Sequence, residues 1–222
     1  MINYFNNVYQ GKTHYYETID ENMKELFIDR FEYATKLSAG KRVLDIGGAL
    51  MPGTDPDHPF AKAYSKISIG AKEYKVVDYQ DLPTVDYILD LNYDKNVKEL
   101  EKIIEDYKPE VILCMEFLEH INYHYEIMQV LARAVGSLNS VVLITLPNSD
   151  NWFWKLLGWD TDHVMGFNRG TATNLITRSN LGKHNVKYVP LVSGKYKWYW
   201  FFVHILTFCQ SFSLAFEIRK KE

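Results

Sequence analysis

The chain has 222 residues, of which 47% are hydrophobic and 24% are charged, and its formal net charge is −3. This composition is typical of a soluble, globular protein and excludes a disordered chain. The slight negative charge gives no strong signal for nucleic-acid binding. The length fits one α/β domain, and we expect residues 1–40 to form a helical cap and residues 41–222 to form the sheet core with its substrate-side insertions.

Three features bear on where the protein acts. The N-terminal residues lack the apolar core of a signal peptide, and Cys114 and Cys209 lie in apolar surroundings that suit reduced, buried thiols. The aromatic segment 198–216 is long enough to span a membrane, but its polar residues favour a buried helix that runs into a final strand. We therefore expect a cytoplasmic protein without membrane association.

The pattern of apolar residues along the chain predicts alternating helices and strands. Helical spacing predicts helices over 18–37, 94–108 and 123–138. Short apolar runs predict strands at 42–46, 75–79, 86–91, 110–115, 140–147, 186–192 and 212–219. This alternation predicts a doubly wound, mostly parallel sheet.

Polar and mostly acidic side chains follow the predicted strands. Since ligands of open α/β sheets bind at the carboxyl ends of the strands, these positions predict one site. Its candidate residues, in strand order, are Asp45, Gly47 and Gly48, then Asp78, then Asp90 and Leu91, then Glu116, and finally Asn148.

The turn after the first strand discriminates between nucleotide cofactors. A dinucleotide-binding turn needs G-x-G-x-x-G, whereas this turn reads GGALMP. Asp78 lies 31 residues beyond Gly47, against roughly 20 in the dinucleotide motif. The pattern favours a nucleoside cofactor without a pyrophosphate and preferably with a positive charge. A nicotinamide-dependent oxidoreductase is the less favoured alternative.

Several motifs occur in a fixed order over residues 40–190: VLDIGG, the acid at Asp78, ILDLN, CMEFLEHI and VVLITLPN. Together they resemble the class I S-adenosylmethionine-dependent methyltransferases, and in particular the subgroup with E-x-x-E-H after the fourth strand. The resemblance implies a Rossmann-like, seven-stranded sheet with an antiparallel last strand, and S-adenosyl-L-methionine as cofactor. It assigns the methionine part to Asp45, Gly47 and Gly48, the ribose to Asp78, the adenine side to Asp90 and Leu91, and the far wall to Glu116 and Phe117.

One segment departs from the family pattern. The family has a helix directly after the first glycines, but here Pro52, Pro56 and Pro59 follow them. Because proline disrupts helix interiors, any helix there must be short or displaced. We predict that Met51–Glu73 is an inserted loop.

The E-x-x-E-H motif has three interpretations. In the structural one, Glu119 is an acid at a helix N-terminus and His120 binds a neighbouring loop. In the second, His120 or His163, with Glu119 beside them, acts as general base on an attacking hydroxyl. In the third, which some relatives exemplify, including small-RNA 2′-O-methyltransferases, a metal site binds Mg²⁺ or Mn²⁺ through Glu116, Glu119, His120 and His163.

The expected function follows from the cofactor and the histidines. A hydroxyl acceptor must lose a proton to a base, and His120 and His163 are candidate bases. We therefore expect O-methylation by direct in-line transfer. The acceptor is expected to be a small molecule or a sugar or glycan precursor, as in the modification of bacterial surface glycans. A methyltransferase-like binding protein without catalysis is the alternative.

Overall fold

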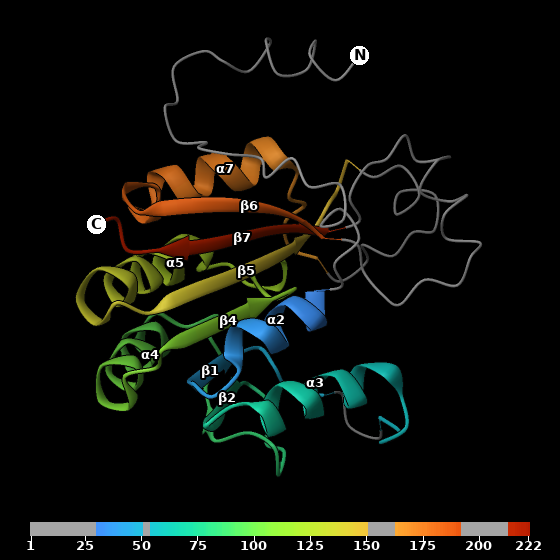
Figure 1. Ribbon diagram of the computed structural model, residues 1–222. Helices are drawn as coiled ribbons and strands as arrows, with labels where there is room; N and C mark the ends of the chain where they lie inside the picture. The colour runs from blue at the N-terminus through green and yellow to red at the C-terminus, as the bar shows by residue number, and fades with distance from the viewer. Residues whose placement is uncertain (1–29, 51–53, 151–162, 192–212) are drawn as a thin grey trace.

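The computed structural model describes residues 30–50, 54–150, 163–191 and 213–222. These residues form a sheet with the strand order β3-β2-β1-β4-β5-β7-β6 (Figure 1). The strands are β1 (Arg42–Ile46), β2 (Glu73–Asp78), β3 (Tyr87–Ile88), β4 (Val111–Met115), β5 (Val141–Pro147), β6 (Asn185–Leu191) and β7 (Ser213–Arg219).

The pairing directions agree with the sheet expected from the sequence. Strands β1 to β5 pair in parallel, and β7 runs antiparallel to both β5 and β6. The order reverses at β1, where β2 lies on one side and β4 on the other. The carboxyl ends of β1 and β4 therefore flank the switch point, which is where open α/β sheets bind ligands. The predicted seven-stranded Rossmann-like sheet with an antiparallel last strand is confirmed.

Helices cover both faces of the sheet. Helices α2 (Arg30–Ser38) and α3 (Pro59–Gly70) lie on one side, and α4 (Asp94–Tyr107), α5 (His124–Arg133) and α7 (Arg169–Arg178) lie on the other (Figure 1). Successive strand residues point to opposite faces, so a doubly covered strand must be apolar throughout. Strand β4 meets this condition, because Leu113 packs in the cluster of α2 and α3 while Ile112 packs in the cluster of α4, α5 and α7.

The predicted inserted loop is wrong in its second half. Residues Pro59–Gly70 form a helix of 12 residues, α3, and Ile67 from this helix is fully buried against the sheet. Proline is well suited to the first position of a helix, because the N–H that it lacks has no intrahelical partner there. Pro59 therefore starts the helix, which is displaced along the chain from the glycine turn, as the three prolines predict.

Other element boundaries differ from the sequence prediction. The predicted third strand, 86–91, contains only the two residues of β3. The predicted helix 123–138 divides into α5 and a π-helical turn, η3 (Ala134–Leu138), which ends at Asn139 in a left-handed conformation. Helix α2 is the end of the predicted helix 18–37, and residues 18–29 lie outside the described residues.

One of the two cysteines and the end of the aromatic segment lie among the described residues. Cys114 is a free, buried thiol in β4, and burial raises its pKa, so its reactive thiolate is disfavoured. Cys209 and most of segment 198–216 lie outside the described residues. Within the described ranges, no helix has both the length and the apolar character that a membrane span requires.

The burial of α4 against the core predicts a loss of stability when one of its buried side chains is truncated. Leu100 is fully buried in this helix, so Leu100→Ala should lower the free energy of unfolding by about 2–5 kcal/mol. Glu105→Ala, at an exposed position of the same helix, should change it by less than about 0.5 kcal/mol. Urea unfolding measures both, and equal effects of the two substitutions would contradict this packing.

Candidate functional site

The turn after β1 requires glycine at two successive positions. Gly47 has a φ of +76°, and a Cβ atom there would lie 2.3 Å from Cδ2 of Phe117. A Cβ atom on Gly48 would lie 2.4 Å from Cγ of Asp45. The N–H of Gly47 donates to the carbonyl oxygen of Val77 at 2.8 Å, which fixes the turn against β2. The turn thus requires glycine because the ring of Phe117 and the carboxyl group of Asp45 pack directly against its backbone.

Asp45 is a buried acid beneath this turn. Its side chain is fully buried, and the hydroxyl of Tyr74 donates a short hydrogen bond to Oδ2. Its Oδ1 atom has no hydrogen-bond partner among the described residues. Burial raises the pKa of Asp45 to about 7; the Tyr74 hydrogen bond opposes this shift, and the charge of Asp78 adds to it. Asp45 is therefore poised between its neutral and charged forms at neutral pH.

Asp78 ends β2 and binds the turn after β1. Its Oδ2 accepts from the N–H of Ala49 at 3.3 Å, and its Oδ1 accepts from the N–H of Gln80 at 3.1 Å. Two backbone donors fix the orientation of this carboxylate at the sheet edge. Directly after it, Tyr79 exposes 67% of its surface, so an aromatic face is available beside the acid.

The two residues predicted after β3 have different surroundings. The Oδ1 atom of Asp90 accepts from the N–H of Asn92 at 3.0 Å, within its own loop. Leu91 is buried and packs in the core with α4 and α5. Asn92 in turn accepts from the N–H of Asn122 at 3.0 Å. Leu91 therefore supports the loop from below, and the loop after β3 is tied to the segment that follows β4.

Glu116 ends β4 in an unusual backbone conformation. Its φ is +50°, which is uncommon for a residue with a side chain. Its N–H donates to the carbonyl oxygen and the hydroxyl of Thr145 in β5, at 2.9 and 3.2 Å. Its Oε2 atom pairs with Nη1 of Arg30 at 3.2 Å, and its buried Oε1 atom has no hydrogen-bond partner in the described part of the chain. Glu116 thus carries a largely buried ion pair at the centre of the sheet edge.

The second acid of the motif lies in a different group. Glu119 and His120 belong to the 3₁₀ turn η2 (Leu118–His120), and the helix α5 begins only at His124. Oxygen and nitrogen atoms of Glu119, His120 and His163 all lie within 4.8 Å of one another. The two imidazole rings meet edge to face with their centroids 4.9 Å apart. Glu119 is 1% exposed, so the cluster has a buried acid with two half-buried histidines above it.

Main-chain hydrogen bonds hold His163 at this cluster. The N–H groups of Val164 and Met165 donate to the carbonyl oxygen of Glu119, at 2.8 and 3.2 Å. Phe167 then pairs with Asn148 beyond β5, and Asn168 caps α7 by accepting from the N–H of Thr171 at 2.8 Å. Residues 163–168, which precede α7, are therefore held by Glu119 at one end and by the cap of α7 at the other.

The structure brings together three of the four residues predicted for the metal site. Glu116 is not part of the Glu119–His120–His163 cluster but pairs with Arg30. Arg30 and Tyr74 were not identified from the sequence. Neither residue belongs to a motif. Only the alternation of side chains along β2 could have indicated that Tyr74 lies on the same sheet face as Asp45 of β1.

Comparisons with known proteins bear on the fold. Neither a family model nor a curated protein matches the sequence. A SAM-dependent methyltransferase from Archaeoglobus fulgidus superposes with a TM-score of 0.55 at 14% identity, over 85% of this chain and 90% of that one. A putative methyltransferase solved with the Haloferax volcanii Trm112 activator has a TM-score of 0.55 at 10% identity, over 86% and 88%.

A third solved structure has a similar likeness. The methyltransferase domain of a bacterial Hen1 protein superposes with a TM-score of 0.51 at 12% identity, over 86% of this chain and 95% of that domain. At such low identities these similarities show the fold alone. The chain has the class I fold of SAM-dependent methyltransferases.

The environment of Asp45 predicts a pH-dependent stability. Its pKa is about 7 in the folded protein and near 3.8 when it is exposed by unfolding. Between these values the folded state binds a proton that the unfolded state lacks. Stability contributed by Asp45 therefore falls as pH rises through this window, by up to about 1.4 kcal/mol per pH unit.

Urea unfolding from about pH 4 to about pH 8 measures this slope. Asp45→Asn keeps an acceptor for Tyr74 but cannot ionise, so its unfolding free energy should fall less steeply over the same window. An identical pH slope in the two proteins would show that Asp45 does not titrate there.

Proposed function

We propose that this protein is an S-adenosylmethionine-dependent methyltransferase that O-methylates a small molecule or a sugar or glycan precursor. The observation that carries the proposal is the meeting of the Gly47–Gly48 turn, Asp78 and Glu116 at the switch point of a methyltransferase-type sheet. The failure of the dinucleotide pattern in that turn argues against the oxidoreductase alternative.

The edge of the sheet suits a cationic nucleoside. Two buried carboxylate oxygens, Oδ1 of Asp45 and Oε1 of Glu116, have no hydrogen-bond partner among the described residues. Buried polar atoms of this kind call for a partner, and a positively charged ligand supplies one. A cation near Asp45 would also favour the charged form of this acid. Asp78 would bind the ribose hydroxyls, with Tyr79 beside it for the base.

The bound cofactor supplies an activated methyl group on a sulfonium. The protein's own tasks are to align the acceptor with the S–CH₃ bond, to exclude water and to receive the acceptor's proton. His120 and His163 are the candidate bases, because both lie beside the carboxyl end of β4 and share a cluster with the buried acid Glu119. Oε1 of Glu119 lies 3.8 Å from Nε2 of His120.

The same cluster fits a divalent cation. One carboxylate and two imidazoles within 4.8 Å of one another form a donor set that can hold Mn²⁺. Mg²⁺ is the alternative ion, and it prefers oxygen ligands to imidazole nitrogens. Such an ion would act as a Lewis acid on the acceptor oxygen. Glu119, His120 and His163 would hold it. Glu116 joins them only if it releases Arg30.

Cofactor binding tests the first part of the proposal. Calorimetry with S-adenosylhomocysteine should give a dissociation constant on the order of micromolar, and NAD⁺ should give no signal. Asp78→Ala should weaken this binding by about tenfold or more, because the ribose loses a charged hydrogen-bond acceptor. Asp81→Ala, at an exposed position three residues further on, is the matched control and should bind normally. If the folded protein gives no calorimetric signal with S-adenosylhomocysteine, the proposal is refuted.

Metal binding tests the role of the histidine cluster. Electron paramagnetic resonance should detect bound Mn²⁺, and His163→Ala should weaken the binding by at least about tenfold. His184→Ala, a histidine outside the cluster, should leave it unchanged. If His163→Ala does not alter Mn²⁺ binding, or if a chelator does not affect methyl transfer, the metal interpretation of the cluster is refuted.

A further inference from the structure

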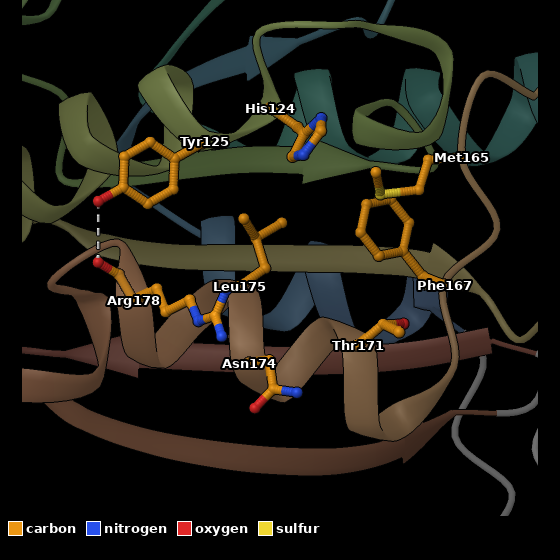
Figure 2. Close-up of a pocket in the computed structure, with 8 residues that line it drawn as sticks. All are labelled: His124, Tyr125, Met165, Phe167, Thr171, Asn174, Leu175 and Arg178. Carbon is orange, nitrogen blue, oxygen red and sulfur yellow. Dashed lines mark hydrogen bonds between the residues drawn. The ribbon is translucent and has the colours of Figure 1, made fainter.

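A groove between α5 and α7 lies beside the histidine cluster. Its volume is about 360 Å³, within the range of small-molecule sites. Figure 2 shows the residues that line it: His124, Tyr125, Met165, Phe167, Thr171, Asn174, Leu175 and Arg178. Neither the fold nor the proposed cofactor and catalytic residues assign any role to this groove.

The groove has an apolar body with a cationic group. Phe167 is buried and contacts His124 edge to face, at 6.1 Å between the ring centroids. Leu175 and Met165 continue this apolar wall. The guanidinium of Arg178 extends alongside Leu175 and Asn174. None of the eight lining residues is acidic, and Arg178 makes no ion pair with any described residue. An apolar ligand with one anionic group complements this lining.

A buried polar atom lies among these residues. Nδ1 of His124 is inaccessible to solvent, and no described residue hydrogen-bonds to it. Buried imidazole nitrogens are normally paired, so this atom has an unmet capacity for a hydrogen bond within a residue that lines the groove. It is independent of Arg178, which lies on the other helix.

The far end of the groove is rigid. The hydroxyl of Tyr125 donates to the carbonyl oxygen of Arg178 at 3.1 Å and accepts from the amide of Gln129 at 2.9 Å. Asn180 donates to the same Gln129 side chain at 2.9 Å. These bonds fix α5 to the end of α7, so the groove is formed before a ligand arrives and binding requires little reordering.

The near end of the groove lies at the proposed catalytic cluster. Met165 is two residues beyond His163, and its N–H donates to the carbonyl oxygen of Glu119 at 3.2 Å. His124 begins the helix four residues after His120. Along α7, Thr171 and Arg178 are seven residues apart, which corresponds to about 10 Å of helix. A molecule in the groove thus extends from the cluster toward the guanidinium.

We propose that this groove binds the distal part of the methyl acceptor, and that the acceptor carries an apolar ring system with a carboxylate or similar anionic group. This inference rests on the proposed methyltransferase function. It narrows the acceptor class, because a bare sugar would leave the apolar wall of Phe167, Leu175 and Met165 without a partner.

The probe for this proposal is 2-naphthoate, with the neutral 2-naphthamide as its isostere. In protein labelled with ¹³C at the methionine methyl groups, 2-naphthoate should shift the Met165 signal saturably. The signal of Met128, a residue of α5 that is buried in the core and does not line the groove, should not move. Met165→Leu assigns the signal. The proposal is overturned if 2-naphthoate leaves Met165 unshifted.

Matched variants test the contribution of the Arg178 charge to binding separately from that of the apolar wall. Arg178→Gln should weaken 2-naphthoate binding by about tenfold and leave 2-naphthamide binding unchanged, because a charge-assisted hydrogen bond is lost. Lys183→Gln removes an exposed cation outside the groove and should affect neither probe. Equal affinities of Arg178→Gln and the unmodified protein for 2-naphthoate would overturn the proposal.

Calorimetry with S-adenosylhomocysteine on the same protein distinguishes failure of the groove proposal from failure of the proposed methyltransferase function. Cofactor binding without 2-naphthoate binding refutes the groove alone and leaves the methyltransferase proposal in place. Binding of 2-naphthoate without any cofactor binding refutes the assignment to a methyl acceptor together with the proposed function. Binding of both, with the Arg178 dependence, supports both proposals.

Discussion

The concentration of acidic groups at one edge of the sheet is the constraint on which the rest of the site depends. Asp45, Asp78 and Glu116 all lie at the carboxyl ends of adjacent strands, where burial strengthens their mutual repulsion. Each is stabilised differently: by the Tyr74 hydroxyl, by two backbone N–H groups and by the Arg30 guanidinium, respectively. Among the described residues Glu116 alone of the three pairs with a cation, and burial, with a smaller contribution from the charge of Asp78, raises the pKa of Asp45. The site therefore retains an electrostatic preference for a further positive charge.

Backbone conformation places these acids, and it does so at some energetic cost. Gly47 and Glu116 both have positive φ angles, and the ring of Phe117 packs directly over Gly47. For Glu116 this conformation costs on the order of 1 kcal/mol or more. The two hydrogen bonds to Thr145 offset part of the cost, since they fix the end of β4 against β5. Glu116 and Glu119 also have different partners. One acid faces α2 and Arg30, and the other faces the histidines.

The sequence predicted the sheet and the acidic strand ends because both depend on local patterns: short apolar runs, and the polar residue that ends each one. It did not predict α3, because the prolines before it were interpreted as helix breakers although Pro59 begins the helix. It placed Glu116 with Glu119 because spacing along the chain does not reveal a left-handed residue between strand and turn. Arg30 and Tyr74 reach the acids through tertiary contacts over long sequence separations, which no local pattern records. The groove between α5 and α7 depends in the same way on the packing of two distant helices.

The end of β4 divides the edge of the sheet into two chemically different halves. On the side of β1 and β2 lie the glycine turn and the acids Asp45 and Asp78, which suit a cationic nucleoside. On the side of β5 lie the histidine cluster with Glu119 and, beside it, the groove, whose lining is largely apolar and includes the cationic Arg178. In the proposed reaction a methyl group leaves the first half and a proton is accepted in the second. Glu116 and Glu119 are only three residues apart, so one short segment fixes both acids. In the proposed reaction this segment would align cofactor and acceptor together, which is the geometric condition for in-line transfer.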